Sequence, residues 1–168
     1  WCVSVCDGLG SRPLSHIGSK KAVNLVRESI RQGRWLPAQS TGLAVRDAWL
    51  EHFAERYREY ETTCLWAHVN SQGQGRAAQT GDGLMLLKSQ GAFQVITGQR
   101  QGFGNQTTTL AQADAALWET AAFELVVPGD GVLLMTDGIS DDLIPEHLEP
   151  FFNTIYSRLA LRSKRRMS

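Results

Sequence analysis

The chain has 168 residues, of which 42% are hydrophobic and 20% are charged, and this length fits one soluble domain of about 150 residues with a buried core. Seventeen basic residues balance seventeen acidic ones, and a formal net charge of zero argues against a protein that binds nucleic acid or an anionic membrane surface. No apolar run approaches the roughly 20 residues that a membrane-spanning helix needs. We therefore expect a single domain over residues 1-168.

The first third of the sequence predicts one strand and two helices. Residues 1–6 form a short apolar run that ends at Asp7-Gly8. Apolar residues then recur at steps of three and four, which is typical of helices with one buried stripe. We expect these helices at residues 15–32, ended by Gly33, and at residues 43–60, with a connector over residues 37–42.

From Thr62 onward the apolar pattern changes to alternation, which is typical of strands. Short runs separated by tight turns predict an antiparallel meander. The expected strands are residues 62–69, 76–80, 84–88, 93–97, 123–127 and 132–136, with a long loop over residues 98–121. A last helix is expected at residues 145–161, with a core face of Leu148, Phe151, Phe152, Ile155 and Leu159. The layout is α+β, with paired helices packed against antiparallel strands.

The cysteines favour a protein that resides inside the cell, in the cytoplasm. There are three, Cys2, Cys6 and Cys64, and an odd number does not fit a closed set of disulfides. Cys2 and Cys6 are four residues apart, which is neither a CxxC motif nor a zinc-ligand spacing. We expect all three to be small buried side chains of strands.

Three aspartates stand at the ends of predicted strands, each followed by glycine: Asp7, Asp82 and Asp137. Glycine lets the backbone turn sharply and leaves its carbonyl open to approach. Carboxylates held at strand ends and facing one spot suit oxygen-preferring cations such as Mg²⁺ or Mn²⁺. The alternative is that each Asp-Gly simply forms a turn. Asp7 and Asp137 follow strongly apolar strands, which a hairpin turn alone does not require, so we favour a metal site.

Motifs of several other sites are absent. Gly8-Leu9-Gly10 resembles the start of a dinucleotide-binding loop, but Pro13 occupies the place of the third glycine. No GxSxG nucleophile elbow surrounds a serine, and the histidines form no HExxH motif. The basic run at residues 162–166 is best explained as a solvated helix end, with binding of a phosphorylated partner as the alternative.

In chain order, the motifs resemble those of the metal-dependent protein phosphatases of type 2C. The matching segments are Val3–Ser11, Ser15–Val26, Glu61–Cys64, Gly81–Gly83 and Gly129–Ile139. Asp7-Gly8-Leu9-Gly10-Ser11 and Phe151-Phe152-Asn153 are similar to the short bacterial branch of the family. The resemblance covers about residues 1–160. It implies two antiparallel sheets sandwiched between pairs of helices, an α-β-β-α sandwich.

This resemblance implies a metal-dependent protein-serine/threonine phosphatase. Asp7 would bridge two Mg or Mn ions, the Gly8 carbonyl would bind one of them, and Asp137 would hold the second. Asp82 matches the position that helps to bind a third, looser metal in some bacterial members. A water activated by both cations would attack phosphoserine or phosphothreonine in line, which makes Asp7 and Asp137 the catalytic residues. The implied partners are a phosphorylated protein substrate and a cognate Ser/Thr kinase, and we expect a cytoplasmic monomer.

The sequence departs from the family pattern at both ends. The family's first strands, with a phosphate-binding Arg and further acidic residues, would lie before Trp1, and its closing Asp-Asn or Asp-Asp motif would lie after Ser168. We therefore expect a domain of an active phosphatase that is trimmed at both ends, with the first and last strands missing. The first alternative is a pseudophosphatase that binds a kinase or other partner. The second is a generic α+β domain with accidental Asp-Gly turns.

Overall fold

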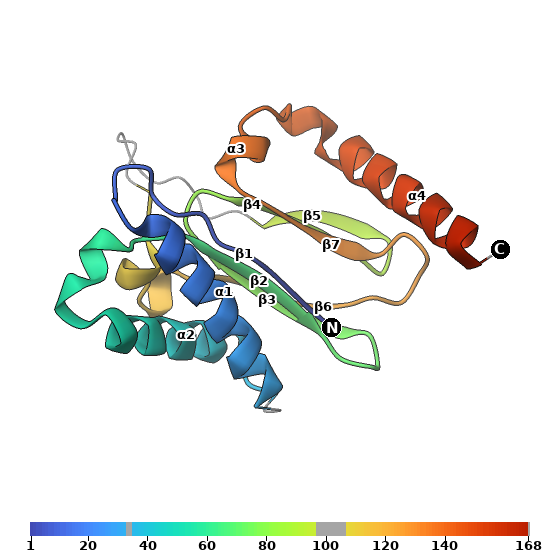
Figure 1. Ribbon diagram of the computed structural model, residues 1–168. Helices are drawn as coiled ribbons and strands as arrows, with labels where there is room; N and C mark the ends of the chain where they lie inside the picture. The colour runs from blue at the N-terminus through green and yellow to red at the C-terminus, as the bar shows by residue number, and fades with distance from the viewer. Residues whose placement is uncertain (33–34, 97–106, 168) are drawn as a thin grey trace.

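The computed structural model describes residues 1–32, 35–96 and 107–167, with side chains as far as Arg162 (Figure 1). The helices and strands are β1 (Cys2–Val5), α1 (Ser15–Arg31), α2 (Ala38–Phe53), β2 (Cys64–Val69), β3 (Gln74–Thr80), β4 (Leu84–Ser89), β5 (Ala92–Ile96), β6 (Glu119–Glu124), β7 (Gly131–Met135), α3 (Asp137–Ser140) and α4 (Leu148–Met167). Short 3₁₀ turns lie at Ala54–Glu59, Leu110–Gln112, Ala115–Leu117 and Pro145–His147. Within these ranges, no helix has the length and apolar character needed to cross a membrane.

The strands form two antiparallel sheets. The first has the order β1-β2-β3-β6 and the second the order β5-β4-β7. Helices α1 and α2 cover the outer face of the first sheet, while α4 and the short α3 lie on the side of the second sheet (Figure 1). The predicted α+β fold of two antiparallel sheets between helices is confirmed. The predicted meander is not a single sheet, because β3 pairs with β6 rather than with β4.

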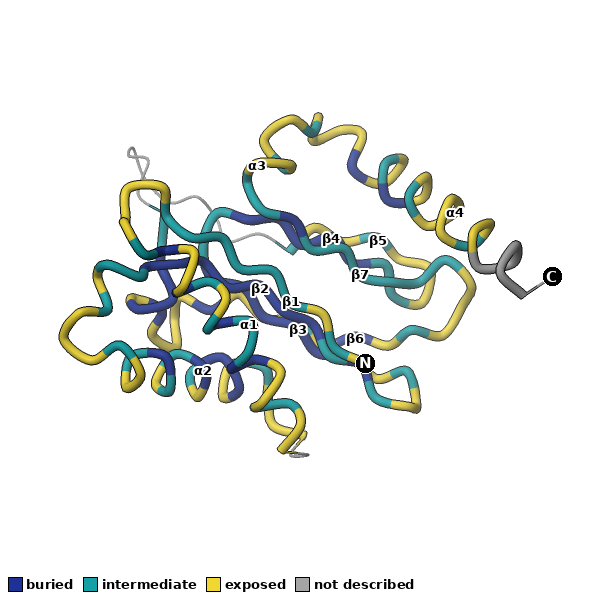
Figure 2. Tube along the Cα trace, in the orientation of Figure 1, coloured by how far each residue is buried: buried dark blue, intermediate teal, exposed yellow. Residues whose placement is uncertain are grey.

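Apolar side chains form a core at each of three interfaces. Between the helices and the first sheet lie Ala22, Val26, Val45, Trp49, Trp66 and Trp118. Between the two sheets lie Ala67, Val69, Ala77, Met85, Leu87 and Phe123. Beneath α4 lie Leu84, Leu86, Met135, Leu148 and Phe152. Alternate residues of β4 thus face opposite cores, and burial is concentrated in β2, β3 and β4 (Figure 2).

The second helix differs from the prediction at both ends. Residues 37–42 are not a connector, because α2 begins at Ala38 with Pro37 as its N-cap. Thr41 donates its N–H to the Pro37 carbonyl at 3.0 Å, and proline suits a helix start because it lacks an N–H group. The helix ends at Phe53 rather than near residue 60, since Ala54 has a φ of 48°. Gly33, which was expected to end the first helix, lies outside the described residues.

The strand predicted at residues 123–127 begins earlier, at Glu119. Its alanine and polar residues pair with β3. Because they show no apolar alternation, residues 119–121 were predicted as part of a loop. Val126 and Val127, which favoured the later strand, instead donate their N–H groups to the Asp130 carboxylate. Residues 97–106 of the predicted loop lie outside the described residues.

The last helix begins at Leu148, after a 3₁₀ turn, and continues to Met167. Leu148 and Phe152 are buried as predicted. Leu159 is 60% exposed, so its expected place in the core is wrong. Leu161 is likewise 62% exposed, and the C-terminal end of α4 extends beyond the strands of the second sheet (Figure 1). Of the basic run at residues 162–166, the structure describes only the side chain of Arg162.

Candidate metal centre

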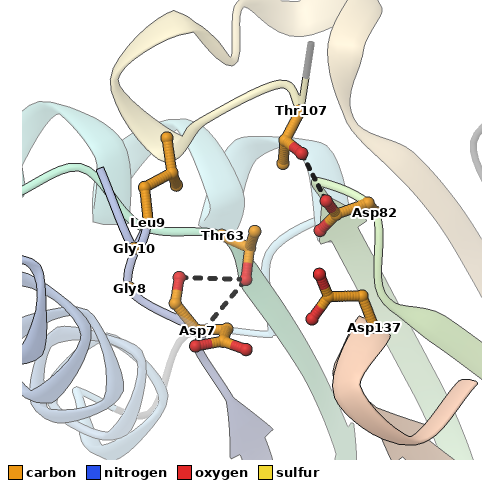
Figure 3. Close-up of a pocket in the computed structure, with 8 residues that line it drawn as sticks. All are labelled: Asp7, Gly8, Leu9, Gly10, Thr63, Asp82, Thr107 and Asp137. Carbon is orange, nitrogen blue, oxygen red and sulfur yellow. Dashed lines mark hydrogen bonds between the residues drawn. The ribbon is translucent and has the colours of Figure 1, made fainter. Parts of the chain in front are cut away.

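The structure brings the three predicted aspartates together around one pocket of about 240 Å³ (Figure 3). Asp7 follows β1, Asp82 lies in the turn between β3 and β4, and Asp137 is the first residue of α3, directly after β7. These strand ends lie at the same edge of the sandwich (Figure 1). The remaining lining residues are Gly8, Leu9, Gly10, Thr63 and Thr107. All side chains predicted for the site therefore face a common space.

The backbone of Asp7 is held by two buried threonines that directly precede β2. Its N–H donates to Thr63 Oγ1 at 3.0 Å. Its carbonyl accepts the Thr63 N–H at 2.8 Å and the Thr62 hydroxyl at 2.8 Å. Because Thr62 and Thr63 are at most 3% exposed, these hydrogen bonds are shielded from water. They place the Asp7 side chain at the mouth of the pocket with little backbone freedom.

Gly8 lies where the chain leaves β1 and passes the start of α1. A Cβ at this position would lie 2.6 Å from the carbonyl carbon and oxygen of Ser15. No side chain fits into that space, so the glycine after Asp7 has a packing reason beyond the formation of a turn. Its carbonyl as a metal ligand stays a prediction.

Asp82 lies across the pocket and is held by Thr107, whose hydroxyl donates to the carboxylate (Figure 3). Gly81 forms the turn with a φ of +110°, and a Cβ there would lie 2.6 Å from the side chain of Thr63. The turn that carries Asp82 therefore packs directly on the threonine that holds Asp7.

Asp137 begins a short helix instead of ending a strand, because β7 stops at Met135. Its Oδ1 accepts the N–H of Gly138 at 2.7 Å. This bond orients the carboxylate at the N-terminus of α3, on the side of the pocket formed by the second sheet.

The pocket concentrates negative charge. Burial raises the pKa of Asp7, the charge of Asp137 and a hydrogen bond with it raise the pKa further, and the charge of Asp82 adds to both. The Gly8 N–H opposes these effects in part. None of the described residues that line the pocket is a lysine or an arginine. A divalent cation would relieve the repulsion between these carboxylates.

The donor chemistry fits magnesium or manganese, because the pocket offers carboxylate, hydroxyl and backbone carbonyl oxygens. The ligand geometry is less complete. In the part of the chain that the structure describes, no three or more His, Cys, Asp or Glu side chains gather closely enough to hold a metal ion. After burial, Asp137 is the strongest influence that raises the pKa of Asp7, whereas the Asp82 carboxylate accepts the Thr107 hydroxyl.

Residues 1–168 match the family model described as protein phosphatase 2C. The chain belongs to the protein phosphatase 2C family. The family predicted from the ordered motifs is thereby confirmed. No individual curated protein matches the chain.

Solved structures with a similar fold include bacterial phosphatases of this type. The serine/threonine phosphatase Stp1 from Staphylococcus aureus is 15% identical with a TM-score of 0.63, over 96% of this chain and 78% of Stp1. The catalytic domain of the serine/threonine protein phosphatase PstP, in complex with two manganese ions, is 18% identical with a TM-score of 0.59, over 96% of this chain and 81% of its own. PppA, a regulatory component of the T6SS in Pseudomonas aeruginosa, is 18% identical with a TM-score of 0.62, over 89% of this chain and 70% of its own. At such identities the likeness shows the fold.

Sequence reasoning missed the threonines that hold the aspartates. Thr62 and Thr63 were predicted only as the start of a strand and as part of the family resemblance, although two adjacent threonines before an apolar strand are a signal of side-chain hydrogen bonding to backbone. Thr107 stands among other threonines in a stretch without any period, so nothing local marked it.

None of the three cysteines lines the pocket described above. Cys64 is fully buried in β2, as predicted, while Cys2 and Cys6 are only partly buried. A hydrogen bond with Cys6, followed by burial, holds the pKa of the Cys64 thiol well above its ordinary value, so Cys64 remains a neutral thiol at physiological pH.

Proposed function

We propose that this protein is a metal-dependent serine/threonine protein phosphatase that hydrolyses phosphoserine and phosphothreonine in a protein substrate. The observation that carries the proposal is the convergence of Asp7, Asp82 and Asp137 on one pocket of a protein phosphatase 2C domain. Further support comes from the fold, which is similar to that of a phosphatase in complex with two manganese ions.

Asp7, with the Gly8 carbonyl, and Asp137 are the residues proposed to hold two Mg or Mn ions, and Asp82 is proposed to help bind a third. When bound, such ions supply a water-derived nucleophile and neutralise the charge that develops on the phosphoryl oxygens.

The chain's own residues contribute position and charge. The hydrogen bonds of Thr62 and Thr63 hold Asp7 at the end of β1. Burial, and then the charges of Asp137 and Asp82, raise the pKa of Asp7, and a bound cation would relieve the repulsion between these carboxylates. An anionic phosphate would be repelled by the same carboxylates, so we expect substrate binding to depend on prior metal binding.

A second candidate function is a binding module, a pseudophosphatase that uses the domain to bind a kinase or other partner. The observation in its favour is that the described aspartates do not form a group of three ligands around one point. The two candidates differ in whether the pocket binds a divalent cation and turns over substrate.

The test uses phosphate release from a phosphoserine or phosphothreonine peptide with and without Mn²⁺, together with Mn²⁺ titration by calorimetry. We expect Mn²⁺-dependent release by the wild type and its loss in D7N, which is nearly isosteric. D47N is the matched control, because the Asp47 side chain is 69% exposed on α2. Full activity of D7N would refute the assigned role of Asp7, and a wild type that neither binds Mn²⁺ nor releases phosphate would favour the binding module.

A further inference from the structure

Behind the pocket, one buried carboxylate contacts two separate segments that form the pocket walls. Glu61 directly precedes the Thr62-Thr63 pair and is 5% exposed. Its Oε2 accepts from Arg12 Nε at 2.6 Å, and its Oε1 accepts from Thr109 Oγ1 at 3.3 Å. Arg12 and Thr109 lie 49 and 48 residues away from Glu61 along the chain, so these contacts join parts of the protein that no local structure connects.

Arg12 belongs to the segment that carries Asp7 and Gly8. Its N–H donates to the Leu9 carbonyl at 3.0 Å, which closes a turn. The Leu9 N–H in turn donates to the Glu61 carbonyl at 3.0 Å. The ion pair between the Arg12 and Glu61 side chains therefore holds this turn against the start of β2 from a second side.

Thr109 belongs to the segment that carries Thr107, the hydrogen-bond donor to Asp82. It is 2% exposed. The next residue, Leu110, donates its N–H to the Thr62 carbonyl at 2.7 Å. Glu61 and Thr62 thus each contact both walls, and each uses its backbone as well as its side chain.

We propose that Glu61 is a positioning residue: its carboxylate fastens the Asp7–Arg12 segment to the Thr107–Leu110 segment and thereby sets how Asp7 and Asp82 face each other across the pocket. An ion pair on the surface contributes little. Here the Arg12 side chain is 41% exposed but that of Glu61 only 6%, and a buried carboxylate favours the state in which its partners are present. Whether Glu61 holds the two segments together does not depend on activity. The expected effect on metal binding, in contrast, rests on the proposed function.

Four variants test the two side-chain contacts of Glu61, with Arg12 and with Thr109. E61A removes both side-chain contacts and leaves the backbone bonds of Leu9 and Leu110 in place, so the fold should persist, which circular dichroism checks. E61Q can accept from Arg12 and donate to the Thr109 hydroxyl, so it should restore both contacts. R12Q removes the contact with the charged Arg12 alone, whereas T109V removes the Thr109 contact together with the cap that its hydroxyl gives to the Leu110–Gln112 turn.

The first measurement is backbone hydrogen exchange, which needs neither metal nor substrate. In E61A, exchange should accelerate about tenfold in residues 8–12 and also in residues 109–112, as expected for loss of a hydrogen bond to a charged group. R12Q should accelerate only the first segment and T109V only the second, while E61Q should resemble the wild type. If hydrogen exchange in E61A accelerates in neither segment, or in only one of them, Glu61 does not hold the two segments together and the proposal is overturned.

The second measurement is the Mn²⁺ dissociation constant by calorimetry. E61A should weaken binding by about 10- to 100-fold, as for other residues that orient metal ligands, and E61Q should restore it. D130A, which removes hydrogen bonds at the opposite end of the strands, serves as a control that lowers stability without touching the pocket.

If E61A binds Mn²⁺ as tightly as the wild type, or if D130A weakens binding to the same extent, the positioning role is overturned. If the wild type neither binds Mn²⁺ nor hydrolyses a phosphopeptide, the proposed function fails and the consequence for metal binding fails with it. Hydrogen exchange then still decides whether Glu61 joins the two segments.

Discussion

Asp130 offers a quantitative test of how the two sheets are joined at the end opposite to the pocket. It lies between β6 of the first sheet and β7 of the second. Its Oδ2 accepts the N–H groups of Gln90, Val126 and Val127 at 3.0, 2.8 and 3.0 Å, and its Oδ1 accepts that of Gly91 at 2.9 Å. One side chain therefore holds the β4–β5 turn to the β6–β7 connection.

D130A removes all four of these hydrogen bonds. A hydrogen bond to a charged group contributes about 1.5–3 kcal/mol when shielded, but these donors are exposed and water replaces part of each bond. We expect the free energy of unfolding to fall by about 2–4 kcal/mol, which for a chain of this length corresponds to a fall in Tm of about 5–12 °C. D130N keeps one acceptor oxygen without the charge and should lose roughly half as much.

The pH dependence of this effect has a defined sign. Burial by itself raises the pKa of Asp130, but the N–H groups of Val127, Gly91, Val126 and Gln90 together outweigh it and hold the pKa below its ordinary value. A carboxyl with a lowered folded-state pKa contributes stability above its unfolded pKa and loses it as the pH falls through the folded pKa. The difference between wild type and D130N should therefore be complete at pH 7 and shrink below about pH 4.

The assay is urea denaturation of wild type, D130A and D130N at pH 7 and at acidic pH. D47A is the matched control, because Asp47 is an exposed aspartate without comparable backbone donors, and its effect should stay within about 0.5 kcal/mol. The reasoning is refuted if D130A unfolds at the same urea concentration as the wild type. It is also refuted if the difference between wild type and D130N does not depend on pH.

Three further changes test the surroundings of the pocket. G18A should lower the free energy of unfolding by about 1–3 kcal/mol, because a Cβ at Gly18 would lie 1.8 Å from the Tyr60 carbonyl oxygen; an unchanged Tm would show that α1 shifts freely. T62V removes the 2.8 Å hydrogen bond to the Asp7 carbonyl. The free energy of unfolding measured in urea should fall by about 1–2 kcal/mol, and Mn²⁺ should bind more weakly. Equal stability of T62V and the wild type would count against the role of this hydrogen bond. Since burial, and then Asp137, raise the pKa of Asp7, protons should compete with Mn²⁺ at a higher pH than at an ordinary aspartate, and the affinity measured by calorimetry should fall as the pH is lowered. A flat profile would contradict that assignment, and D137N should shift the fall to lower pH.

Much of the fold could be predicted because its patterns are local. Short runs separated by turn residues located β2, β3, β4 and β7 to within two residues, and the stripe with Ala22 and Val26 located α1. The start of β6 could not be predicted, since its alanine and polar residues become a strand only by pairing with β3. The exposure of Leu159 could not be predicted either, because it depends on where the second sheet ends beneath α4.

The candidate site, like the fold, could be predicted only where its signals are local. Asp7, Asp82 and Asp137 could each be located from an Asp-Gly at a strand end, because an apolar run and its terminating turn are written in adjacent residues. The side chains that hold them could not be found in this manner. Thr107 and Thr109 stand in a stretch without a period, and Glu61 looks like an ordinary charged residue before a strand.

By itself, then, the sequence determined the local elements, the family and the position of each carboxylate relative to its own strand. Only the tertiary structure decided which strands became neighbours, and hence that Asp7, Asp82 and Asp137 line one pocket while Asp82 accepts the Thr107 hydroxyl. It also decided that Glu61 meets Arg12 and Thr109, from 49 and 48 residues away. The physical reason is that local propensity acts over a few residues, whereas partners at such separations are selected by the packing of whole sheets and helices against one another.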